Sequence, residues 1–320
     1  MNLNDQKPSR PKVTGRLAPS PSGRLHMGNL LSFMVASLSS DELVLRIEDL
    51  DPQRSKQCFV DQLLRDLEYL GFEWIGKVLR QSERSEAYRH AYQELDRQGL
   101  LYPCFCTRAD LHSADAPHFG EELVYANTCR KLTDSERQRA WESSFAPGAR
   151  RPSWRLEVTD QPFVFDDLFQ GHQCWRLTES SGDFIVRRSD GVFAYQLAVV
   201  VDDAAQGVGQ VVRGIDLLSS VPRQRYLQDL LGLPNPQVGH VPLLVDGEGR
   251  RLSKRNGDAS LSHLIDDRHV GASRIFGHLA WLCGIVPEPC SLGLDELRRY
   301  ASLDVLKGKQ RIVWTPLVFD

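Results

Sequence analysis

The sequence has no long apolar run. No stretch approaches the roughly twenty consecutive apolar residues that a membrane-spanning helix needs. The first ten residues, MNLNDQKPSR, are polar and lack the apolar core of a secretory signal. Internal repeats and low-complexity segments are also missing. We therefore expect a cytoplasmic protein in which residues 1–10 form a flexible tail.

A strong charge of one sign is missing as well. The 320 residues include 39 Lys and Arg against 42 Asp and Glu, a formal net charge of −3, so overall charge does not attract nucleic acid. A nucleic-acid partner would have to be bound by local basic clusters, for which the candidates are residues 187–188, 250–255 and 307–311. The length allows one large or two modest domains with a substantial core.

Cysteine is scarce and odd in number. Seven cysteines do not fit a framework of paired disulfides, and three of them, Cys104, Cys106 and Cys129, are close in sequence. This pattern favours metal binding in a reducing compartment, with unligated thiols as the alternative. Three thiolates can face one Zn²⁺, which takes four tetrahedral ligands, and chemistry alone favours His112 or His118 as the fourth. The cysteines without a partner at metal spacing are Cys58, Cys174, Cys283 and Cys290.

From Val13 onward, strand patterns alternate with helical patterns. Strands are expected at residues 14–18, 43–47 and 101–106, and helices at 28–39, around 60–70 and at 83–98. Repeated βαβ units predict an α/β fold with a doubly wound parallel sheet of the Rossmann type. Ligands of such folds bind beyond the carboxyl ends of the strands. The junction at residues 26–29 lies there.

Residues 107–182 interrupt this alternation, because they carry charge and proline and few periodic apolar runs. We interpret them as a subdomain inserted between the two halves of a nucleotide-binding domain, residues 11–106 and 183–260. In the second half, strand and helix patterns return at 183–188 and 192–203, and then at 207–212, 223–231 and 241–245. Residues 261–320 are expected to form a short helical C-terminal region, with helices at 272–283 and 294–300.

Two remote segments carry the nucleotide chemistry. The sequence HMGN at residues 26–29 begins a predicted helix, where unpaired N–H groups and the helix dipole favour an anion. Gly28 removes a side chain that would hold a phosphate away from the backbone, and His26 and Asn29 offer donors. The second segment, GRRLSKRNG at 249–257, is a basic loop with a glycine at each end. Each segment alone fits an ordinary turn.

The order and separation of these segments resemble the HIGH-type and KMSKS-type motifs of class I aminoacyl-tRNA synthetases, here HMGN and RLSKR at 251–255. The resemblance extends to RLAPSPSGRLHMGN at 16–29, LRIEDLDPQR at 45–54, FAYQLAVVVDD at 193–203 and VVRG at 211–214. Together these segments are similar to the glutamyl branch of the family and cover residues 16–255. The resemblance implies a Rossmann-type class I catalytic domain whose inserted region contacts the acceptor end of tRNA.

The activity that the resemblance implies is adenylation, in which a carboxylate attacks the α-phosphorus of ATP and pyrophosphate leaves. Such a reaction needs positioning and charge neutralisation more than covalent help, with Mg²⁺ accompanying the ATP. His26 and Lys254 are the expected catalytic residues, and Lys254 offers a compact charge on a long stem. The expected ATP-binding residues are His26, Gly28, Asn29, Ser253 and Lys254. Arg251 stands where the family has its first lysine, so we assign it no strong role.

Glutamate recognition is expected, again by resemblance, at Arg16, Ser20, Glu48, Tyr195 and Arg213. Arginine suits a carboxylate because its planar fork binds both oxygens, and an acidic residue suits an ammonium. We therefore expect Arg16, Tyr195 and Arg213 around the side-chain carboxylate and Glu48 at the α-amino group. Asp49 and Asp51 are interpreted as carboxylates that stabilise a turn near Arg54.

The length resembles a truncated branch of the family, the glutamyl-queuosine tRNA(Asp) synthetases, because only 65 of the 320 residues follow Arg255. A further domain needs on the order of a hundred residues, so no anticodon-binding domain is expected. The zinc pattern of this branch, C-x-C followed by Y-x-x-x-C, points to Tyr125 as the fourth ligand beside Cys104, Cys106 and Cys129. A closed site with four protein ligands would be structural.

The truncated branch implies transfer of glutamate from glutamyl-adenylate to the queuosine base at the wobble position of tRNA(Asp). The expected partners are ATP, L-glutamate and queuosine-containing tRNA(Asp), with a monomeric enzyme and one structural Zn²⁺ per chain. One alternative is a glutamyl-tRNA synthetase that charges the 3′ end of tRNA(Glu). An alternative of another class is a tRNA-binding or regulatory module without turnover.

Overall fold

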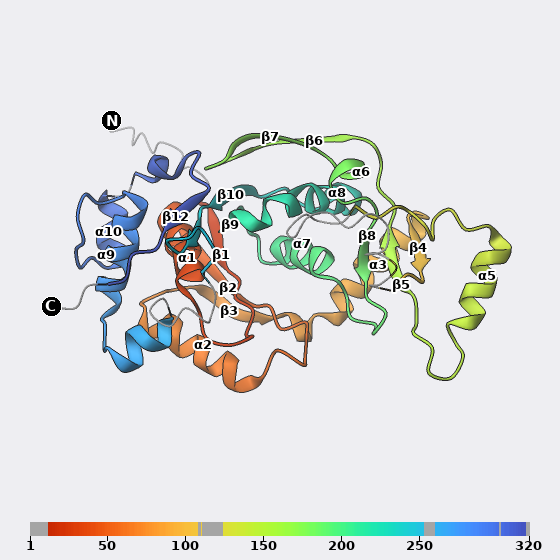
Figure 1. Cartoon of the computed structure of the whole chain (residues 1–320), viewed down its shortest axis with the longest axis horizontal. Coiled ribbons are helices and arrows are strands. Elements are labelled where there is room, and N and C mark those ends of the chain that lie inside the picture. Colours follow the sequence, from red (N-terminus) through yellow and green to blue (C-terminus); the bar gives the residue numbers. More distant parts are fainter. Residues whose placement is uncertain (1–11, 108–109, 111–123, 253–259, 301, 318–320) are drawn as a thin grey trace, which may run out of the picture.

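A parallel sheet forms the centre of the computed structural model, which describes residues 12–107, 110, 124–252, 260–300 and 302–317. Three parallel strands run in the order β1 (Thr14–Leu17), β2 (Glu42–Ile47) and β3 (Ile75–Arg80). On the other side of β1 lie β9 (Gln210–Gly214) and β10 (Gln237–Val241), also parallel (Figure 1). The N–H of Gly209 donates to the Thr14 carbonyl at 2.9 Å and joins the two halves.

The predicted doubly wound α/β fold is confirmed, and β1 and β9 stand where the strand order reverses. The first crossover contains α1 (Met27–Ser39) and the second contains α2 (Gln57–Tyr69). After β3 come a 3₁₀ turn at Gln81–Glu83 and α3 (Ser85–Arg97). In the second half, α7 (Tyr195–Ala205) precedes β9, and a 3₁₀ helix at Ile215–Ser220 and α8 (Val221–Leu231) follow it.

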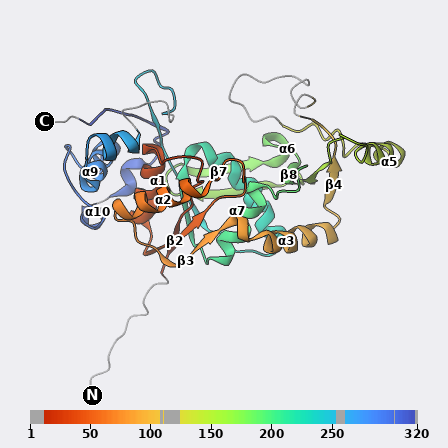
Figure 2. The same cartoon turned by 90° about the horizontal axis from the view of Figure 1, so that it is seen from below.

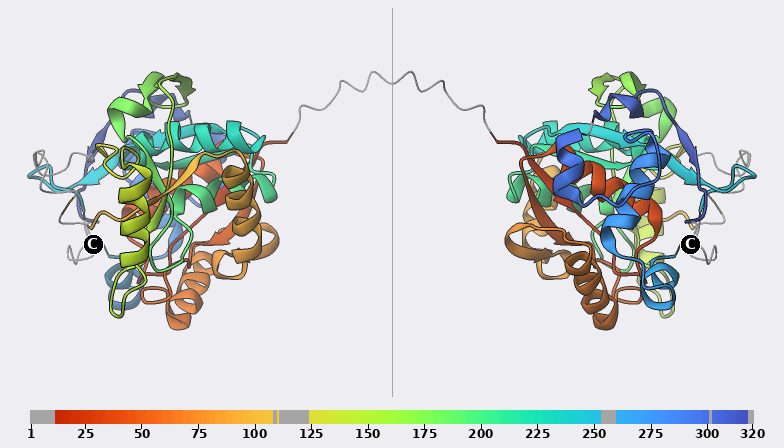
Figure 3. Two further views of the ribbon diagram at one scale, coloured as in Figure 1. Left: turned by 90° about the vertical axis from the view of Figure 1, so that its right-hand side faces the viewer. Right: turned by 90° about the vertical axis from the view of Figure 1, so that its left-hand side faces the viewer.

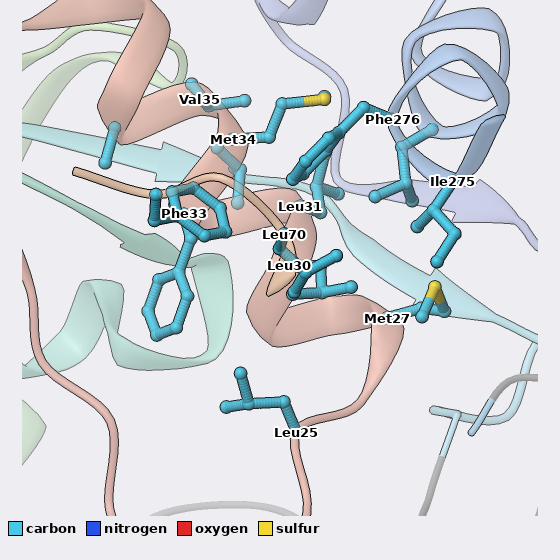
Figure 4. Close-up of a cluster of buried hydrophobic side chains, with 14 of the residues drawn as sticks. Leu25, Met27, Leu30, Leu31, Phe33, Met34, Val35, Leu70, Ile275 and Phe276 are labelled. Atoms are coloured by element: carbon cyan, nitrogen blue, oxygen red, sulfur yellow. The ribbon is translucent and has the colours of Figure 1, made fainter. Parts of the chain in front are cut away.

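Helix α1 is the centre of the main apolar core. Its sequence, MGNLLSFMVASLS, is apolar on nearly all sides, and Leu30, Leu31 and Met34 are fully buried. Ile275 and Phe276 of α9 (Ala272–Cys283) share this cluster with α1 (Figure 4). Each such side chain contributes about 1.5–3 kcal/mol by leaving water. The packing fixes α1 from both sides and thereby holds the residues at its N-terminus in place.

The predicted strand at 101–106 forms, but the prediction that it continues the parallel sheet is wrong. Strand β4 (Leu101–Cys104) pairs antiparallel with β5 (Ser153–Leu156), which pairs antiparallel with β8 (Phe184–Arg187). The strand that follows α3 thus belongs to a separate sheet of the order β4, β5, β8 and not to the central sheet. A helix followed by a strand has the same local pattern in both cases, so periodicity could not distinguish the two pairings.

The segment at 107–182 contains more regular structure than its composition indicates. It includes α5 (Asp134–Ser143), β6 (Pro162–Asp167), β7 (Gly171–Arg176) and the short α6 (Leu177–Ser180). Helix α5 begins with a capping box between Thr133 and Glu136. Strands β6 and β7 form a hairpin, and β6 pairs with β10 of the central region. Strand pairing therefore crosses both ends of the segment, whose role as a separate subdomain stays a prediction.

Strand β3, at one edge of the central sheet, was not predicted. The first half of β3 is exposed and contains Gly76 and Lys77, so it has no apolar alternation. The predicted strand at 241–245 forms only in part. Strand β10 ends at Val241 and β11 (Leu243–Val245) follows it, because Pro242 between them cannot donate to a ladder. Strand β11 pairs in parallel with β12 (Arg311–Val313), which lies in the region expected to be helical.

The C-terminal region otherwise has the helices that were expected. After a π-helical turn at His263–Asp267 come α9, α10 (Leu294–Tyr300) and a 3₁₀ turn at Leu303–Leu306. These helices and α5 lie at opposite ends of the long axis (Figures 1 and 2). Viewed from the C-terminal end, α9 and α10 cover α1 (Figure 3). Of the helices in the described residues, none is both long and apolar enough to cross a membrane.

Candidate functional site

A cavity of about 430 Å³ opens at the carboxyl ends of β1 and β9. Doubly wound folds bind their ligands at this position, where the strand order reverses. The cavity is lined by residues of the loop after β1, the start of α1, the end of β2, the start of α7 and the segment around β11. It brings together the predicted ATP-binding and glutamate-binding residues that the structure describes: Arg16, Ser20, His26, Gly28, Asn29, Glu48, Tyr195 and Arg213.

His26 is the N-cap of α1. Its Nδ1 accepts the backbone N–H of Asn29 at 3.3 Å, and the Asn29 side-chain oxygen accepts the backbone N–H of His26 at 3.2 Å. This reciprocal capping box fixes both side chains at the positive end of the helix. A Cβ at Gly28 would lie 3.0 Å from the His26 ring, so Gly28 also provides room for the histidine. The remaining N–H groups of the first turn can meet a phosphate.

The described residues on either side of Ser253 and Lys254, in the predicted basic loop, lie at the same site. Leu252 lines the cavity, and Ser260 forms an isolated antiparallel bridge with His26. Ser253 and Lys254 lie outside the described residues. Arg251 also lines the cavity and pairs with Asp216 at 2.6 Å. Its charge is therefore paired with a carboxylate, and the weak role assigned to it stays a prediction.

Two buried arginines share one carboxylate at the floor of the cavity. Arg16 Nε lies 3.1 Å from Asp203 Oδ1, and Arg46 Nη1 donates to the same oxygen at 2.7 Å. Arg46 is fully buried, and its Nη2 also donates to Glu48 Oε1 at 3.2 Å. Glu48 is thereby held at the cavity wall while its side chain keeps one tenth of its surface exposed. An ammonium group can reach it there.

Arg213 differs from these arginines because its hydrogen-bond partners are neutral. Its Nε donates to His240 Nε2 at 3.0 Å and its Nη2 donates to Gln224 Oε1 at 2.9 Å. Nη1 is buried and has no hydrogen-bond partner among the described residues. Burial lowers the pKa of Arg213, against the effects of the Tyr195 side chain and the Asp203 carboxylate. A buried donor of this kind requires an acceptor.

Tyr195 is the first residue of α7, and its hydroxyl is influenced by Glu48 and by the arginines Arg213 and Arg16. Burial, and after it the Glu48 carboxylate, raise the pKa of Tyr195, whereas Arg213 and Arg16 act in the opposite direction. The hydroxyl therefore remains a donor at neutral pH. Ser20 lies in the exposed rim of the cavity. The cluster contains three buried arginines against the two carboxylates Asp203 and Glu48, so one positive charge remains for a ligand.

Several residues of the site were not predicted from the sequence. Arg46 and Asp203 lie within the family motifs and were given no role, and His240 was not assigned to the site. Asp167 was not considered. A signal was available, because a charged or titratable residue inside an otherwise apolar strand is expected to have a buried partner. Periodicity could not identify that partner.

Asp51 stabilises a turn near Arg54, as predicted, whereas Asp49 contacts the 3₁₀ turn at Gln81–Glu83 instead. Asp49 is buried and accepts the N–H and the hydroxyl of Ser82, each at 2.8 Å. Asp51 accepts the N–H of Gln53 at 3.1 Å. Arg54 lies 3.8 Å from Asp51.

A second cluster lies where β4 meets the inserted segment. The sulfurs of Cys104, Cys106 and Cys129 all lie within 4.8 Å of one another, and those of Cys106 and Cys129 are 3.5 Å apart. The Tyr125 hydroxyl is 3.5 Å from Cys104 Sγ and 3.8 Å from Cys106 Sγ. Tetrahedral thiolates at about 2.3 Å from a zinc ion would lie roughly 3.8 Å apart. The cluster can therefore hold a metal ion.

The surroundings favour a thiolate. The Cys129 thiol, the Tyr125 hydroxyl and the Arg155 guanidinium lower the pKa of Cys104 to about 4, against the effect of burial. Arg155 Nε donates to Cys104 Sγ at 3.2 Å, and its guanidinium lies 3.6 Å from the centre of the Tyr125 ring. The histidines considered as the fourth ligand, His112 and His118, lie outside the described residues. Of the remaining cysteines, Cys283 is buried and Cys290 is half-buried, whereas Cys58 and Cys174 are exposed.

The chain is similar to several known proteins. Residues 12–284 match the family model described as tRNA synthetases class I (E and Q), catalytic domain. The glutamyl-Q tRNA(Asp) synthetase of Geobacter sulfurreducens is 44% identical over 279 residues, which cover 85% of this chain and 85% of that protein. The protein of the same name from Symbiobacterium thermophilum is 44% identical over 302 residues, covering 89% of this chain and 91% of the relative.

Among solved structures, the glutamate-tRNA synthetase of Elizabethkingia anophelis has a similar fold. The TM-score is 0.75 at 22% identity, and the match covers 94% of this chain and 68% of that chain. At this identity the similarity concerns the fold alone.

Proposed function

The chain belongs to the class I tRNA synthetases of the E and Q type, a family of ligases, and we propose that it activates L-glutamate with ATP and transfers it to the queuosine base of tRNA(Asp). The observation that carries the first half is the buried Arg213, whose Nη1 lacks an acceptor in the same cavity that holds the His26 junction. The second half comes from the name shared by the relatives.

In the proposed activation step, an oxygen of the glutamate α-carboxylate attacks the α-phosphorus of ATP, and the bond to the pyrophosphate oxygen breaks. The capped start of α1 supports binding of the phosphates, because His26 and the first-turn N–H groups face the cavity. Mg²⁺ bound to ATP would share the charge of the leaving group. Ser253 and Lys254 are proposed to contact the ATP on the basis of sequence, and the flanking Leu252 and Ser260 lie at the site.

The charge of the pocket supports glutamate as the amino acid. Glutamate has two carboxylates and one ammonium, so its net charge matches the one positive charge left by the buried cluster. Arg213 and Tyr195 are proposed to bind the side-chain carboxylate together with Arg16, and Glu48 is proposed to bind the α-ammonium. Glutamine would leave the charge of Arg213 unmatched in a desolvated site, at a cost of a few kcal/mol.

The proposed acceptor chemistry is compatible with the same cavity. The cyclopentenediol of queuosine carries neighbouring hydroxyls, as the ribose at a tRNA 3′ end does, and one hydroxyl oxygen would attack the activated carbonyl and release AMP. This substrate implies a cytoplasmic enzyme. We propose that the enzyme acts as a monomer.

The metal of the cysteine cluster is proposed to be one structural Zn²⁺. Cys104, Cys106 and Cys129 provide the sulfur ligands that zinc prefers, and Tyr125 provides an oxygen at the fourth position. A zinc ion there would join β4 to the start of the inserted segment. It would stabilise the fold and take no part in the reaction.

Two assays test the proposal. Glutamate-dependent exchange of pyrophosphate into ATP, measured without tRNA, is expected for the purified protein and would be missing from a module without turnover. Transfer of labelled glutamate is then compared on tRNA(Asp) with queuosine, tRNA(Asp) without queuosine, and tRNA(Glu). Labelling of the first alone supports the proposed acceptor, whereas labelling of tRNA(Glu) at its 3′ end would replace it.

A further inference from the structure

Arg213 is held in place by a chain of buried residues that starts outside the cavity. His240 Nε2 accepts the Nε–H of Arg213 at 3.0 Å, and His240 Nδ1 lies at hydrogen-bond distance from the Asp167 carboxylate. The side chains of Asp167 and His240 are completely buried. Neither residue lines the cavity, so any effect on a ligand must act through Arg213.

The backbone fixes the geometry of this chain. Asp167 ends β6 and His240 lies on β10, and the backbone N–H of His240 donates to Asp167 Oδ1 at 3.0 Å. The His240 carbonyl accepts the side-chain amide of Gln170 at 2.8 Å. A Cβ at Gly239 would lie 2.9 Å from the Phe169 ring, so glycine allows β10 to approach the turn that follows β6. The backbone of His240 is thus fixed by Asp167 and Gln170, and this fixes the position of its imidazole.

The tautomer of His240 follows from its neighbours. An ionised carboxylate only accepts hydrogen bonds, so the hydrogen of a neutral His240 lies on Nδ1, facing Asp167. Nε2 then has a free lone pair, which the Nε–H of Arg213 requires. The opposite tautomer would place an N–H against an N–H and rotate the guanidinium away.

The partners of the buried arginines differ in charge. Arg16 and Arg46 are paired with carboxylates, whereas Arg213 is held by an imidazole and an amide. Neutral acceptors orient the guanidinium without forming an ion pair with it, so its positive charge can pair with a ligand. Two of its three nitrogens are occupied, and the third, Nη1, is left for the ligand.

We propose that Asp167 and His240 are positioning residues that orient Arg213 without neutralising it and thereby set the affinity of the enzyme for glutamate. This inference rests on the proposed function, in which Arg213 binds the side-chain carboxylate. A purely structural role, in which the two residues only join β6 to β10, predicts loss of stability without a selective change in glutamate binding.

The test compares two substitutions of His240. His240→Phe fills the same space without an acceptor, and His240→Gln supplies an amide oxygen near the position of Nε2. Exchange of pyrophosphate is measured while glutamate and ATP are varied separately. For His240→Phe, the KM for glutamate is expected to rise about tenfold or more, since a charged donor loses its alignment, while the KM for ATP stays within about twofold. His240→Gln is expected to recover most of the loss.

His278→Phe is the matched control. His278 is also buried and hydrogen-bonded, to the Thr315 carbonyl at 2.7 Å, but it lies on α9 away from the cavity. It is expected to lower the melting temperature without changing the KM for glutamate. The proposal is overturned if His240→Phe leaves that KM unchanged, raises both KM values equally, or is not improved upon by His240→Gln.

Asp167→Asn provides the same test should His240→Phe fail to fold. Asparagine keeps the volume of the side chain, but its amide can donate to Nδ1 and so stabilise the wrong tautomer. A selective rise in the KM for glutamate is again expected, and an unchanged KM would contradict the proposal. If the wild-type protein activates a different amino acid, the proposed function fails, and the comparison of His240 variants is made with that amino acid.

Discussion

Ser260 lies opposite His26 in an isolated antiparallel bridge. After the predicted basic loop that contains Lys254, the chain thus returns to the N-cap of α1. Leu252, just before Lys254, lines the cavity. Two segments more than two hundred residues apart in the sequence meet at one site. This arrangement supports the sequence-based assignment of Lys254 to the reaction.

Lys254→Ala is expected to lower the kcat of glutamate activation by about 10²-fold or more, because a charge that stabilises the departing pyrophosphate is lost. Stability is expected to be unchanged within about 0.5 kcal/mol. Arg250→Ala is the control, since Arg250 is exposed and pairs with Asp246 and Glu248 outside the cavity. Pyrophosphate exchange and thermal unfolding measure both effects. Equal kcat values for wild type and Lys254→Ala would remove this lysine from the mechanism.

Arg213→Gln is expected to weaken glutamate binding without destabilising the protein. Without the guanidinium, glutamate loses its charged partner, which costs about 2 kcal/mol or more of binding. The same change removes a buried charge that no carboxylate compensates, so the melting temperature is expected to stay the same or to rise. Titration calorimetry with glutamate and thermal unfolding test the two statements, and a large loss of stability would contradict the second.

Arg46→Gln is expected to destabilise the protein, in contrast to Arg213→Gln. Arg46 is fully buried and joins Asp203 to Glu48, so its removal leaves two buried carboxylates poorly paired. Breaking a buried ion pair on one side costs about 3–5 kcal/mol. Urea unfolding of the two variants side by side is the measurement. If Arg213→Gln lowered the free energy of unfolding more than Arg46→Gln does, the charge assignment of the pocket would be wrong.

Local patterns predicted much of the fold and of the site. Helix α1 and helix α9 were predicted within one residue at each end, because their apolar patterns and flanking turns are strong. The motif residues His26, Glu48 and Arg213 come together in one cavity. Resemblance, not periodicity, is what connected them before the structure was known.

The remaining features depend on pairing between distant segments, which local patterns do not encode. Strand β4 has the same pattern whether it joins a parallel or an antiparallel sheet. The contact between Asp167 and His240 joins residues 73 positions apart, and neither residue lies in a strand that the local pattern predicted. Strand β12 is three residues long and half exposed, which is too short to show alternation.

Stability is expected to fall when the pH drops below about 6.5. Burial, and after it Arg213, lower the pKa of His240, while Asp167 and the Leu217 carbonyl raise it. Burial and Arg274 also lower the pKa of His278, against the Thr315 carbonyl. The unfolded chain therefore binds more protons below the ordinary histidine pKa of about 6.5. The stabilisation is complete above that value and is lost as the pH falls toward the folded-state pKa values.

Urea unfolding at pH 7.5, 6.5 and 5.5 measures this dependence. The free energy of unfolding is expected to fall between pH 6.5 and 5.5, and to fall less in His240→Gln than in wild type. Comparing variant with wild type cancels any common loss of metal in acid. The pKa of Asp167 is also lowered, so its own contribution is lost only below about pH 3.8 and does not enter this window. A stability that rises toward pH 5.5 would contradict the assignment of His240 as neutral.

Cys129→Ser is expected to abolish metal binding and to destabilise the start of the inserted segment. The Cys129 sulfur accepts the N–H of Phe105 and lies 3.5 Å from the Cys106 sulfur, so its loss opens the cluster on two sides. Elemental analysis is expected to find one zinc per chain in wild type and none in the variant, with a lower melting temperature. Cys174→Ser, an exposed thiol outside the cluster, is expected to change neither. Because the cluster does not line the cavity, activation of glutamate in the folded variant should keep its KM for ATP. A wild-type protein free of zinc and other metals, yet fully stable in a chelator, would show that these thiols pack without an ion.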